Sequence, residues 1–451
     1  MAPGPALRAR AARRCAFFLI LLGAGTAAAA PKLQAIGEAS LGYTDNFRTT
    51  PQSPLLSGAP RSAGAFVMLS PGVVLALESP RAVQRIGYRY EYDLFLAQST
   101  ASGSSNQVDY HGFFELSKAV RLLLGSSASE TNRYAAVAFS APGSAAAGVP
   151  AGTGAFAQAE ADEALNFDLG VGWRAWQGGR ALVEAPILGT TAPQTTEFGL
   201  NSGVERSFLR DAVGGEARAD YTVVRDSVLS DGTPAGVQQQ LVASGVALWR
   251  HDWGRDFTSS AEAGAARVQR FNTGRGLWSP VGTAMLAYAN ESGDAQLSYA
   301  HRISTNAVLG QSLLADEIRL GGALPLTRRN ELLLAVSAAY QHGRLIDENA
   351  NLAAHVNVLM GDVALGWQAT RALEVALRYQ HIQQTSDAQA PPLPLSFVQN
   401  NVLLGAILRF PPDRDMPRAY RAPRRVDGSD EIREGVTPAA KVESQTETPS
   451  R

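Results

Sequence analysis

Hydrophobic and polar positions alternate with a period of two along much of this chain. Between residues 85 and 96 the even positions are apolar or tyrosine, whereas the odd positions include Arg85, Arg89, Glu91 and Asp93. A pleated strand places successive side chains on opposite faces, so this stretch has one apolar and one charged face. It is longer than most strands of soluble proteins and suits a tilted strand that crosses a bilayer.

The same alternation returns at residues 108–116, 165–174, 297–303 and 373–380. In a soluble sandwich the polar face would meet water and the apolar face would pack on a second sheet. Here the polar face mixes small residues with charges, which suits a water-filled lumen, and the apolar face suits lipid. The pattern predicts an all-β transmembrane barrel.

The predicted connections alternate in length. Long loops on one side and short turns on the other are typical of outer-membrane barrels, and an even strand number places both chain ends in the periplasm. Counting strands gives about 18, within a range of about 16 to 20 because residues 181–206 are poorly patterned. Short turns are predicted near 78–81, 118–119, 177–180, 207–211, 252–256, 290–294, 327–330 and 370–371, and longer loops near 48–61, 98–106, 133–160, 191–195, 225–239, 272–278, 304–312, 344–354 and 386–395.

The barrel has to close, because an open edge in hydrocarbon would leave backbone groups unpaired at several kcal/mol each. Aromatic residues near strand ends are candidates for the interfacial girdles of such a barrel. The alternative is that they form the core of a soluble β protein. They are Tyr92, Tyr110, Trp173, Trp249, Trp253, Tyr299, Tyr340, Trp367 and Tyr379.

The two ends differ from this central part. Residues 1–30 combine an arginine-rich start, an apolar run and an alanine-rich cleavage region, which predicts a secretory signal peptide rather than an uncleaved anchor. The barrel is predicted over residues 31–410. Residues 411–451 are rich in proline and charge and predict a disordered periplasmic tail, which either docks on a partner or stays solvated.

Composition narrows the function classes. The formal net charge is −1, so there is no basic footprint for nucleic acid. The single cysteine, Cys15, lies inside the predicted signal peptide, and the six histidines show no metal-binding spacing. No nucleophile motif is present. We therefore expect no enzyme, no cofactor, no catalytic residue and no metal site.

The charged face of the strands supplies the candidate site. Its two signs are interleaved, so many of these side chains are expected to pair across strands and stiffen the wall, and unpaired ones to bind a passing solute weakly. The long segment 133–160 either constricts the lumen or lies outside it. The lumen-lining candidates are Arg85, Arg89, Glu91, Asp93, Asp109, Glu115, Arg174, Arg302, Arg319 and Arg378.

Short motifs in the first strands resemble a known family. The run Leu-Gly-Tyr-Thr-Asp-Asn at 41–46, with Tyr43, Asp45 and Asn46, is followed by Ser-Pro-Gly-Val at 70–73 and Tyr-Arg-Tyr at 88–90. These stretches are similar to the outer-membrane, porin-like β-barrels associated with the exopolysaccharide and capsule secretion systems of Gram-negative bacteria. From the residues alone, Asp45 and Asn46 are expected to end the strand in a turn, or Asp45 to pair with a lumen arginine.

The resemblance implies a function. It implies a conduit that carries a polysaccharide through its lumen and receives it from a periplasmic polysaccharide export protein. It also implies insertion into outer-membrane lipid by the barrel assembly machinery, and the stretch ending in Phe410 resembles the signal that this machinery recognises. The alternatives are a general diffusion porin and a surface structural or adhesin barrel.

Overall fold

The computed structural model describes residues 31–46, 63–96, 102–132, 155–188, 194–228, 234–254, 256–290, 292–306, 311–327, 331–346, 352–387 and 396–412. Within these ranges the chain forms eighteen β-strands. The strands are β1 (Lys32–Thr44), β2 (Gly64–Ser79), β3 (Ala82–Phe95), β4 (Gly103–Ser117), β5 (Val120–Thr131), β6 (Ala155–Gly170), β7 (Trp173–Leu188), β8 (Gln194–Ser207), β9 (Asp211–Val228), β10 (Pro234–Asp252), β11 (Phe257–Arg270), β12 (Gly276–Asn290), β13 (Gly293–Asn306), β14 (Gln311–Pro325), β15 (Leu332–Ile346), β16 (Leu352–Gln368), β17 (Leu373–Ser386) and β18 (Phe397–Phe410).

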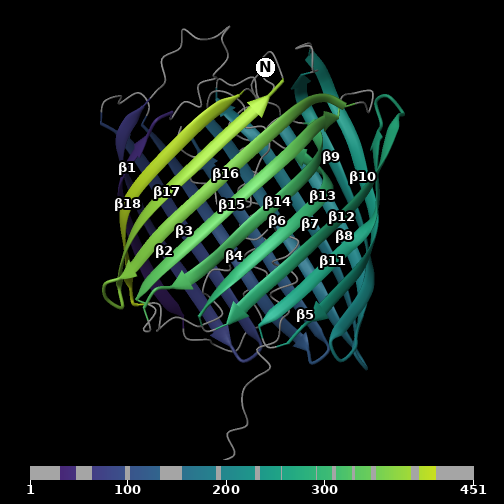
Figure 1. The fold of residues 1–451 in the computed structure, drawn as a ribbon, viewed down its shortest axis with the longest axis horizontal. Coiled ribbons are helices and arrows are strands. Elements are labelled where there is room, and N and C mark those ends of the chain that lie inside the picture. The colour runs from purple at the N-terminus through teal and green to yellow at the C-terminus, as the bar shows by residue number, and fades with distance from the viewer. Residues whose placement is uncertain are drawn as a thin grey trace, which may run out of the picture.

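The strands form one closed antiparallel sheet. Each strand pairs with its neighbours in the sequence, and β1 pairs with both β2 and β18. Leu41, for example, lies opposite Val67 on one side and Leu404 on the other. The tilted strands wrap around a central space (Figure 1). The predicted up-and-down barrel of about 18 strands is confirmed, and no strand edge is left unpaired.

The two faces of the wall differ in chemistry. On β1, Leu33 and Tyr43 are 63% and 51% exposed, whereas Gln34 and Thr44 beside them are buried. Large exposed hydrophobic side chains continue along the same face of the other strands, for example Leu297, Leu377 and Leu404. The polar face is the more buried because it lines the concave side of the wall, where side chains crowd together.

Such a wall belongs in a membrane. A closed barrel satisfies its backbone groups internally, and its apolar outer face matches hydrocarbon while its polar face encloses water. This is the architecture of bacterial outer-membrane barrels, and the protein is a barrel of the outer membrane. Among the described residues, no helix is long and apolar enough to cross a membrane.

One predicted turn is wrong. The chain turns at Val171 and Gly172, and β7 then continues through residues 177–180, where a turn was predicted. Gly178 and Gly179 suggested a turn, but their missing side chains serve packing. A Cβ on Gly178 would lie 2.2 Å from the side-chain oxygen of Asn201, so this glycine makes room for the neighbouring strand's side chain.

The remaining turns and loops define two ends of the barrel. The turns at 80–81, 118–119, 171–172 and 208–210 lie on one side, together with the start of β1 and the end of β18. We call this the turn side and the other the loop side; by the usual asymmetry of these barrels the turn side faces the periplasm. Several predicted long loops are shorter than expected, because β4 starts at Gly103, β6 at Ala155 and β10 at Pro234.

Three predicted segments lie outside the described residues. They are the signal peptide at 1–30, the part of the 133–160 loop that precedes β6, and the tail beyond residue 412.

Candidate functional site

The predicted lumen-lining residues lie on the polar face of the wall. On β3, Arg85, Arg89, Glu91 and Asp93 alternate with Ile86, Tyr88, Tyr90 and Tyr92, which share the outward face with the exposed Leu94. The same alternation places Asp109 and Glu115 of β4, Arg174 of β7, Arg302 of β13, Arg319 of β14 and Arg378 of β17 on the polar face. Their part in binding a solute remains a prediction.

Several of these residues form ion pairs. Arg89 lies 3.9 Å from Glu38 of β1 and 3.6 Å from Glu91 of its own strand. Arg302 contacts Glu317 at 3.1 Å. The buried Glu317 also contacts Arg319, so one carboxylate joins two guanidinium groups. Cross-strand pairing of this kind is what the interleaved charges predict.

Other candidates have different surroundings. Arg378 contacts Asp362 of β16 at 2.5 Å, and Asp109 lies 3.9 Å from His111 of its own strand. Asp93 is buried. Glu115 lies opposite Arg121 in the β4–β5 register, and Arg174 lies opposite Asp168 and Glu205. The side chain of Arg85 is partly exposed.

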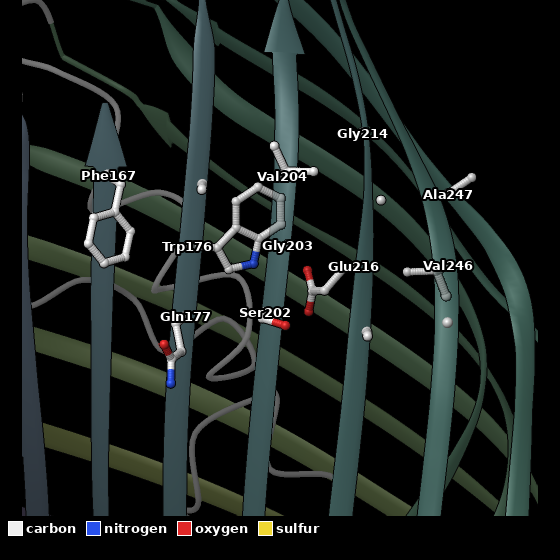
Figure 2. A pocket seen from close by; sticks show the side chains of 14 residues that line it. Phe167, Trp176, Gln177, Ser202, Gly203, Val204, Gly214, Glu216, Val246 and Ala247 are labelled. Carbon is white, nitrogen blue, oxygen red and sulfur yellow. The ribbon is translucent and has the colours of Figure 1, made fainter. Parts of the chain in front are cut away.

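A tryptophan lies flat on the lumen wall. Trp176 of β7 shares the polar face with Arg174, and its partner in the β7–β8 register is Gly203. A Cβ on Gly203 would lie 2.2 Å from Cζ2 of the indole, so only glycine lets the ring rest on β8. Figure 2 shows the ring over β8 at Gly203, with Glu216 on the next strand beside it. The ring is partly exposed.

Polar groups held in fixed positions lie beside this ring. Glu216 of β9 is opposite Gly203 and is buried. Its Oε1 accepts from Nε of Arg218 at 2.5 Å and from the amide of Asn201 at 3.3 Å. Arg218 reaches across β10 and donates to Glu262 of β11 at 3.2 Å. We call Trp176, Asn201, Glu216, Arg218 and Glu262 the lumen platform.

A shallow hollow lies beside Trp176 and Glu216 of the platform. Small residues on both faces leave this hollow of about 840 Å³ in β6–β10. Its lining is shown in Figure 2 and comprises Phe167, Ala175, Trp176, Gln177, Ser202, Gly203, Val204, Gly214, Gly215, Glu216, Ala217, Gly245, Val246 and Ala247.

The alternation along β9 and β11 also predicts Glu216, Arg218 and Glu262 on the lumen face, whereas Trp176 and Asn201 were not predicted there. The turn predicted at 177–180 interrupted β7 just after Trp176 and hid the alternation Arg174, Trp176, Gly178, Arg180. Had the two glycines been read as part of the strand, this rhythm would have placed Trp176 in the lumen.

The loop-side mouth contains contacts between strands that are not neighbours. Arg270, the last residue of β11, donates to the carbonyl oxygen of Ile346 at 2.6 Å, and Ile346 ends β15. Ser312 of β14 donates to the side-chain oxygen of Gln240 of β10 at 2.7 Å. Buried apolar residues of these strands pack together beside the contacts, including Val268 and Ile346. The loop-side ends of β14 and β15 therefore contact β10 and β11 and narrow the mouth.

The N-terminal motif helps to close the barrel. The carboxylate of Asp45 accepts from the backbone N–H of Asn400 at 2.7 Å and from its side-chain amide at 2.6 Å. The amide of Asn46 donates to the carbonyl oxygen of Val398 at 2.9 Å. The described partner of Asp45 is thus Asn400 of β18, not a lumen arginine. Tyr43 and Phe410 are exposed on the outer face of β1 and β18.

The described residues contain no group of three or more histidine, cysteine, aspartate or glutamate side chains that could hold a metal ion. The lumen wall offers hydrogen bonds, charges and the flat aromatic ring of Trp176. These groups suit weak binding of a polar solute.

Comparisons with known proteins give the following. No protein-family model matches the chain, and a search of curated protein sequences found no match either. Among solved structures, Pseudomonas aeruginosa OccK2 (OpdF) in complex with glucuronate is 10% identical with a TM-score of 0.43, over 84% of this chain and 98% of that one. The siderophore receptor PirA of the same species is 10% identical with a TM-score of 0.40, over 83% of this chain and 80% of that one.

The FrpB iron transporter of Neisseria meningitidis is also similar, at 10% identity and a TM-score of 0.43, over 84% of this chain and 82% of that one. At these values the likeness assigns neither a substrate nor a direction of transport to this chain.

Proposed function

We propose that this protein is a passive outer-membrane conduit for a secreted polysaccharide. The observation that carries the proposal is the lumen platform, because it combines a flat aromatic face with fixed carboxylate, amide and guanidinium groups. A sugar ring has an apolar face of C–H groups and an edge of hydroxyls. The indole of Trp176 suits the first, and the polar groups of Asn201, Glu216 and Arg218 suit the second.

The wall has the properties that a sliding polymer needs. Conduction requires sites that are weak and multiple, because a solute has to leave each one. The arginines Arg89, Arg218, Arg302 and Arg378 already contact carboxylates of the wall. Such pairs present both donors and acceptors to neutral hydroxyl groups without one dominant charge. The periplasmic export protein expected from the resemblance would deliver the polymer to the turn side.

The first experiment tests export in the cell. We expect a deletion strain to lose its surface polysaccharide while cytoplasmic synthesis of the polymer continues, because only the last step is removed. Surface staining and quantification of cell-associated and intracellular polymer measure both. Normal surface polymer in the deletion strain would end the proposal.

The second experiment tests the platform directly. In planar bilayers, neutral oligosaccharides added to the wild-type channel should cause transient current blocks, and Trp176→Ala should shorten them several-fold because the stacking face is lost. Trp173→Ala is the matched control, because Trp173 lies on the same strand but is exposed on the outer face. Equal block times in wild type and Trp176→Ala would show that the platform binds no sugar.

A general diffusion channel is the second candidate. The even mixture of paired charges around the wall favours it, since no single dense site selects one solute. The two candidates separate in the bilayer experiment. A diffusion channel conducts small ions and sugars without oligosaccharide blocks, and its deletion lowers uptake of small solutes while surface polymer is unchanged.

A further inference from the structure

A carboxylate lies on the lipid-facing side of β6. Glu163 shares the outward face with Phe167 and the exposed Leu169, and its own side chain is exposed. It lies opposite Gly179 of β7 and extends over it, since a Cβ on Gly179 would lie 3.3 Å from Oε1 of Glu163. Within the described part of the chain, Glu163 makes no hydrogen bond or ion pair.

Glu163 lies well inside the hydrocarbon layer. Trp173, exposed on the same outer face at the turn-side end of β7, is one of the aromatic residues expected at the membrane interface. Gly179 is about 20 Å further along β7, which is about 15 Å of depth for a strand tilted by about 40°. The apolar band of such barrels is about 25 Å tall, so this depth is near its middle. Asp211 and Arg267, which also face outward, lie near strand ends instead.

Two further polar side chains continue this surface across β7 and β8. Gln177 and Ser202 lie opposite each other in the β7–β8 register, on the same outward face as Glu163, and both are exposed (Figure 2). Neither forms a hydrogen bond with another described residue. We call Glu163, Gln177 and Ser202 the polar track. Lipid tails offer no hydrogen bonds, so another protein surface is what can satisfy these groups at this depth.

The outer face beside the polar track carries only small side chains. Three successive outward positions on each of β9, β10 and β11 hold glycine or alanine, whereas β13, β17 and β18 carry the exposed Leu297, Leu377 and Leu404 on this face. We call these positions the small-residue patch, which comprises Gly215, Ala217, Ala219, Ala243, Gly245, Ala247, Ala261, Ala263 and Ala265.

The patch and the track adjoin each other. The hollow of about 840 Å³ spans their border, because Gln177, Ser202, Ala217 and Gly245 all line it. Proteins associate in a membrane largely through van der Waals packing, and small side chains let two backbones approach closely. This sector therefore combines room for a close contact with polar groups that lack partners.

We propose that the polar track and the small-residue patch form an interface with a second copy of this chain. Copies of one barrel insert into the outer membrane in the same direction, so a rotation about the membrane normal relates them and keeps every residue at its depth. The polar track of one copy then meets the polar track of the other. A different membrane protein would need its own polar groups at this depth, whereas a second copy has them by symmetry.

The chemistry of the track suits contact with itself. A glutamine amide and a serine hydroxyl each donate and accept, so Gln177 and Ser202 are complementary to the same residues of a second copy. The amide of Gln177 in that copy also supplies a donor for the carboxylate of Glu163. The interface does not depend on which solute the lumen carries.

Disulfide cross-linking in outer membranes tests the contact. The only cysteine, Cys15, lies in the predicted signal peptide, so one introduced cysteine reports one position. Ser202→Cys should give a disulfide-linked dimer on a non-reducing gel, because a two-fold axis through the track brings both copies of residue 202 together. Leu404→Cys is the matched control, since Leu404 is 53% exposed in the apolar belt of β18, and it should stay monomeric. Equal cross-linking of both variants, or cross-linking of neither, would overturn the proposal.

Native mass spectrometry of the full-length barrel in detergent measures the strength of the interface. Ala217→Leu should raise the dissociation constant of the dimer at least about tenfold, because a larger side chain prevents the close approach. Glu163→Leu should also weaken the dimer, since it removes a polar group of the track. A surface that only meets lipid would accept both leucines without any change in oligomeric state.

Ala39→Leu is the control for both variants, because it places the same side chain on the outer face of β1. It should leave the dimer unchanged, and a heat-shift gel confirms that each variant is a folded barrel. A monomeric wild type would overturn the proposal. So would a dimer that neither Ala217→Leu nor Glu163→Leu weakens, since the copies would then meet on another face.

Discussion

Single residues of this barrel serve both the wall and the lumen. Gly203 shows how: without a side chain it lets Trp176 lie on β8, and it therefore determines that an aromatic face looks into the lumen. Glu216 shows the electrostatic counterpart, a buried carboxylate whose Oε1 contacts both Arg218 and Asn201. In both cases a neighbouring strand decides what the side chain does.

Arg218→Leu should destabilise the barrel. It removes the guanidinium group that Glu216 and Glu262 share, and the loss of a hydrogen bond to a charged group costs about 1.5–3 kcal/mol. The free energy of unfolding, measured by urea titration in detergent or bilayers, is the readout. Arg250→Leu is the control, since Arg250 is half exposed, lies 3.5 Å from Glu205, and should cost less than about 1 kcal/mol. Equal losses for both variants would contradict this view of the platform.

Gly203→Val should displace the indole of Trp176, because its Cβ would overlap the ring. We expect the current blocks by oligosaccharides to shorten as in Trp176→Ala while the barrel still folds. Near-ultraviolet circular dichroism and tryptophan fluorescence would report the displaced ring. An unchanged tryptophan signal would show that the ring does not rest on β8.

At the scale of elements, the seam between β1 and β18 is the one place where the two ends of the barrel have to find each other. All other neighbouring strands follow one another in the chain, whereas this pair is joined only through space. Asp45 and Asn46 of the N-terminal motif contact β18 at its loop-side start. The motif therefore helps to fix the register between β1 and β18, where the barrel closes, in addition to ending its strand.

Asp45→Ala should weaken this seam. It removes two acceptor contacts from Asn400, so the folded form should convert to the unfolded form at a lower temperature in a heat-shift gel. The control is Asn106→Ala, which removes one contact with Tyr88 between two strands that are consecutive in the chain. A larger shift for the control than for Asp45→Ala would contradict the special role of the seam.

At the scale of the whole molecule, the barrel is not a uniform cylinder. The end of β14 and β15 leans on β10 and β11 through the Arg270–Ile346 and Ser312–Gln240 contacts. The platform lies on the β7–β11 wall. The narrowing and the platform therefore share β11 but lie at different heights, because Arg270 is the last residue of β11 and Glu262 lies nearer its turn-side start.

Arg270→Ala should widen the loop-side mouth, because it removes the donor that holds the end of β15. The single-channel conductance in planar bilayers should rise relative to wild type. Arg250→Ala, which changes a half-exposed arginine near the turn side, should leave the loop-side mouth as it is. If conductance is the same in Arg270→Ala and wild type, the contact does not limit the current.

The sequence alone determined the barrel, because the alternation of side chains is a local property of each strand. A strand that lies between lipid and water has to be apolar on one face and polar on the other. The residues of β3 already showed which positions face water and which face lipid. The sequence-based prediction failed where one local pattern fits two structures. Gly178 and Gly179 suggested a turn, since glycine inside a strand and glycine in a turn look the same without the neighbouring side chain.

Only the tertiary structure decided what lies together across strands. Register placed Trp176 on Gly203, joined Arg218 to two acids, and set His342 and His355 side by side. The six histidines looked scattered along the chain, yet three share a Tyr-x-His pattern whose partner is always on the next strand. A period of two specifies the face of a residue but not its height in the wall, and that height depends on strand pairing and closure.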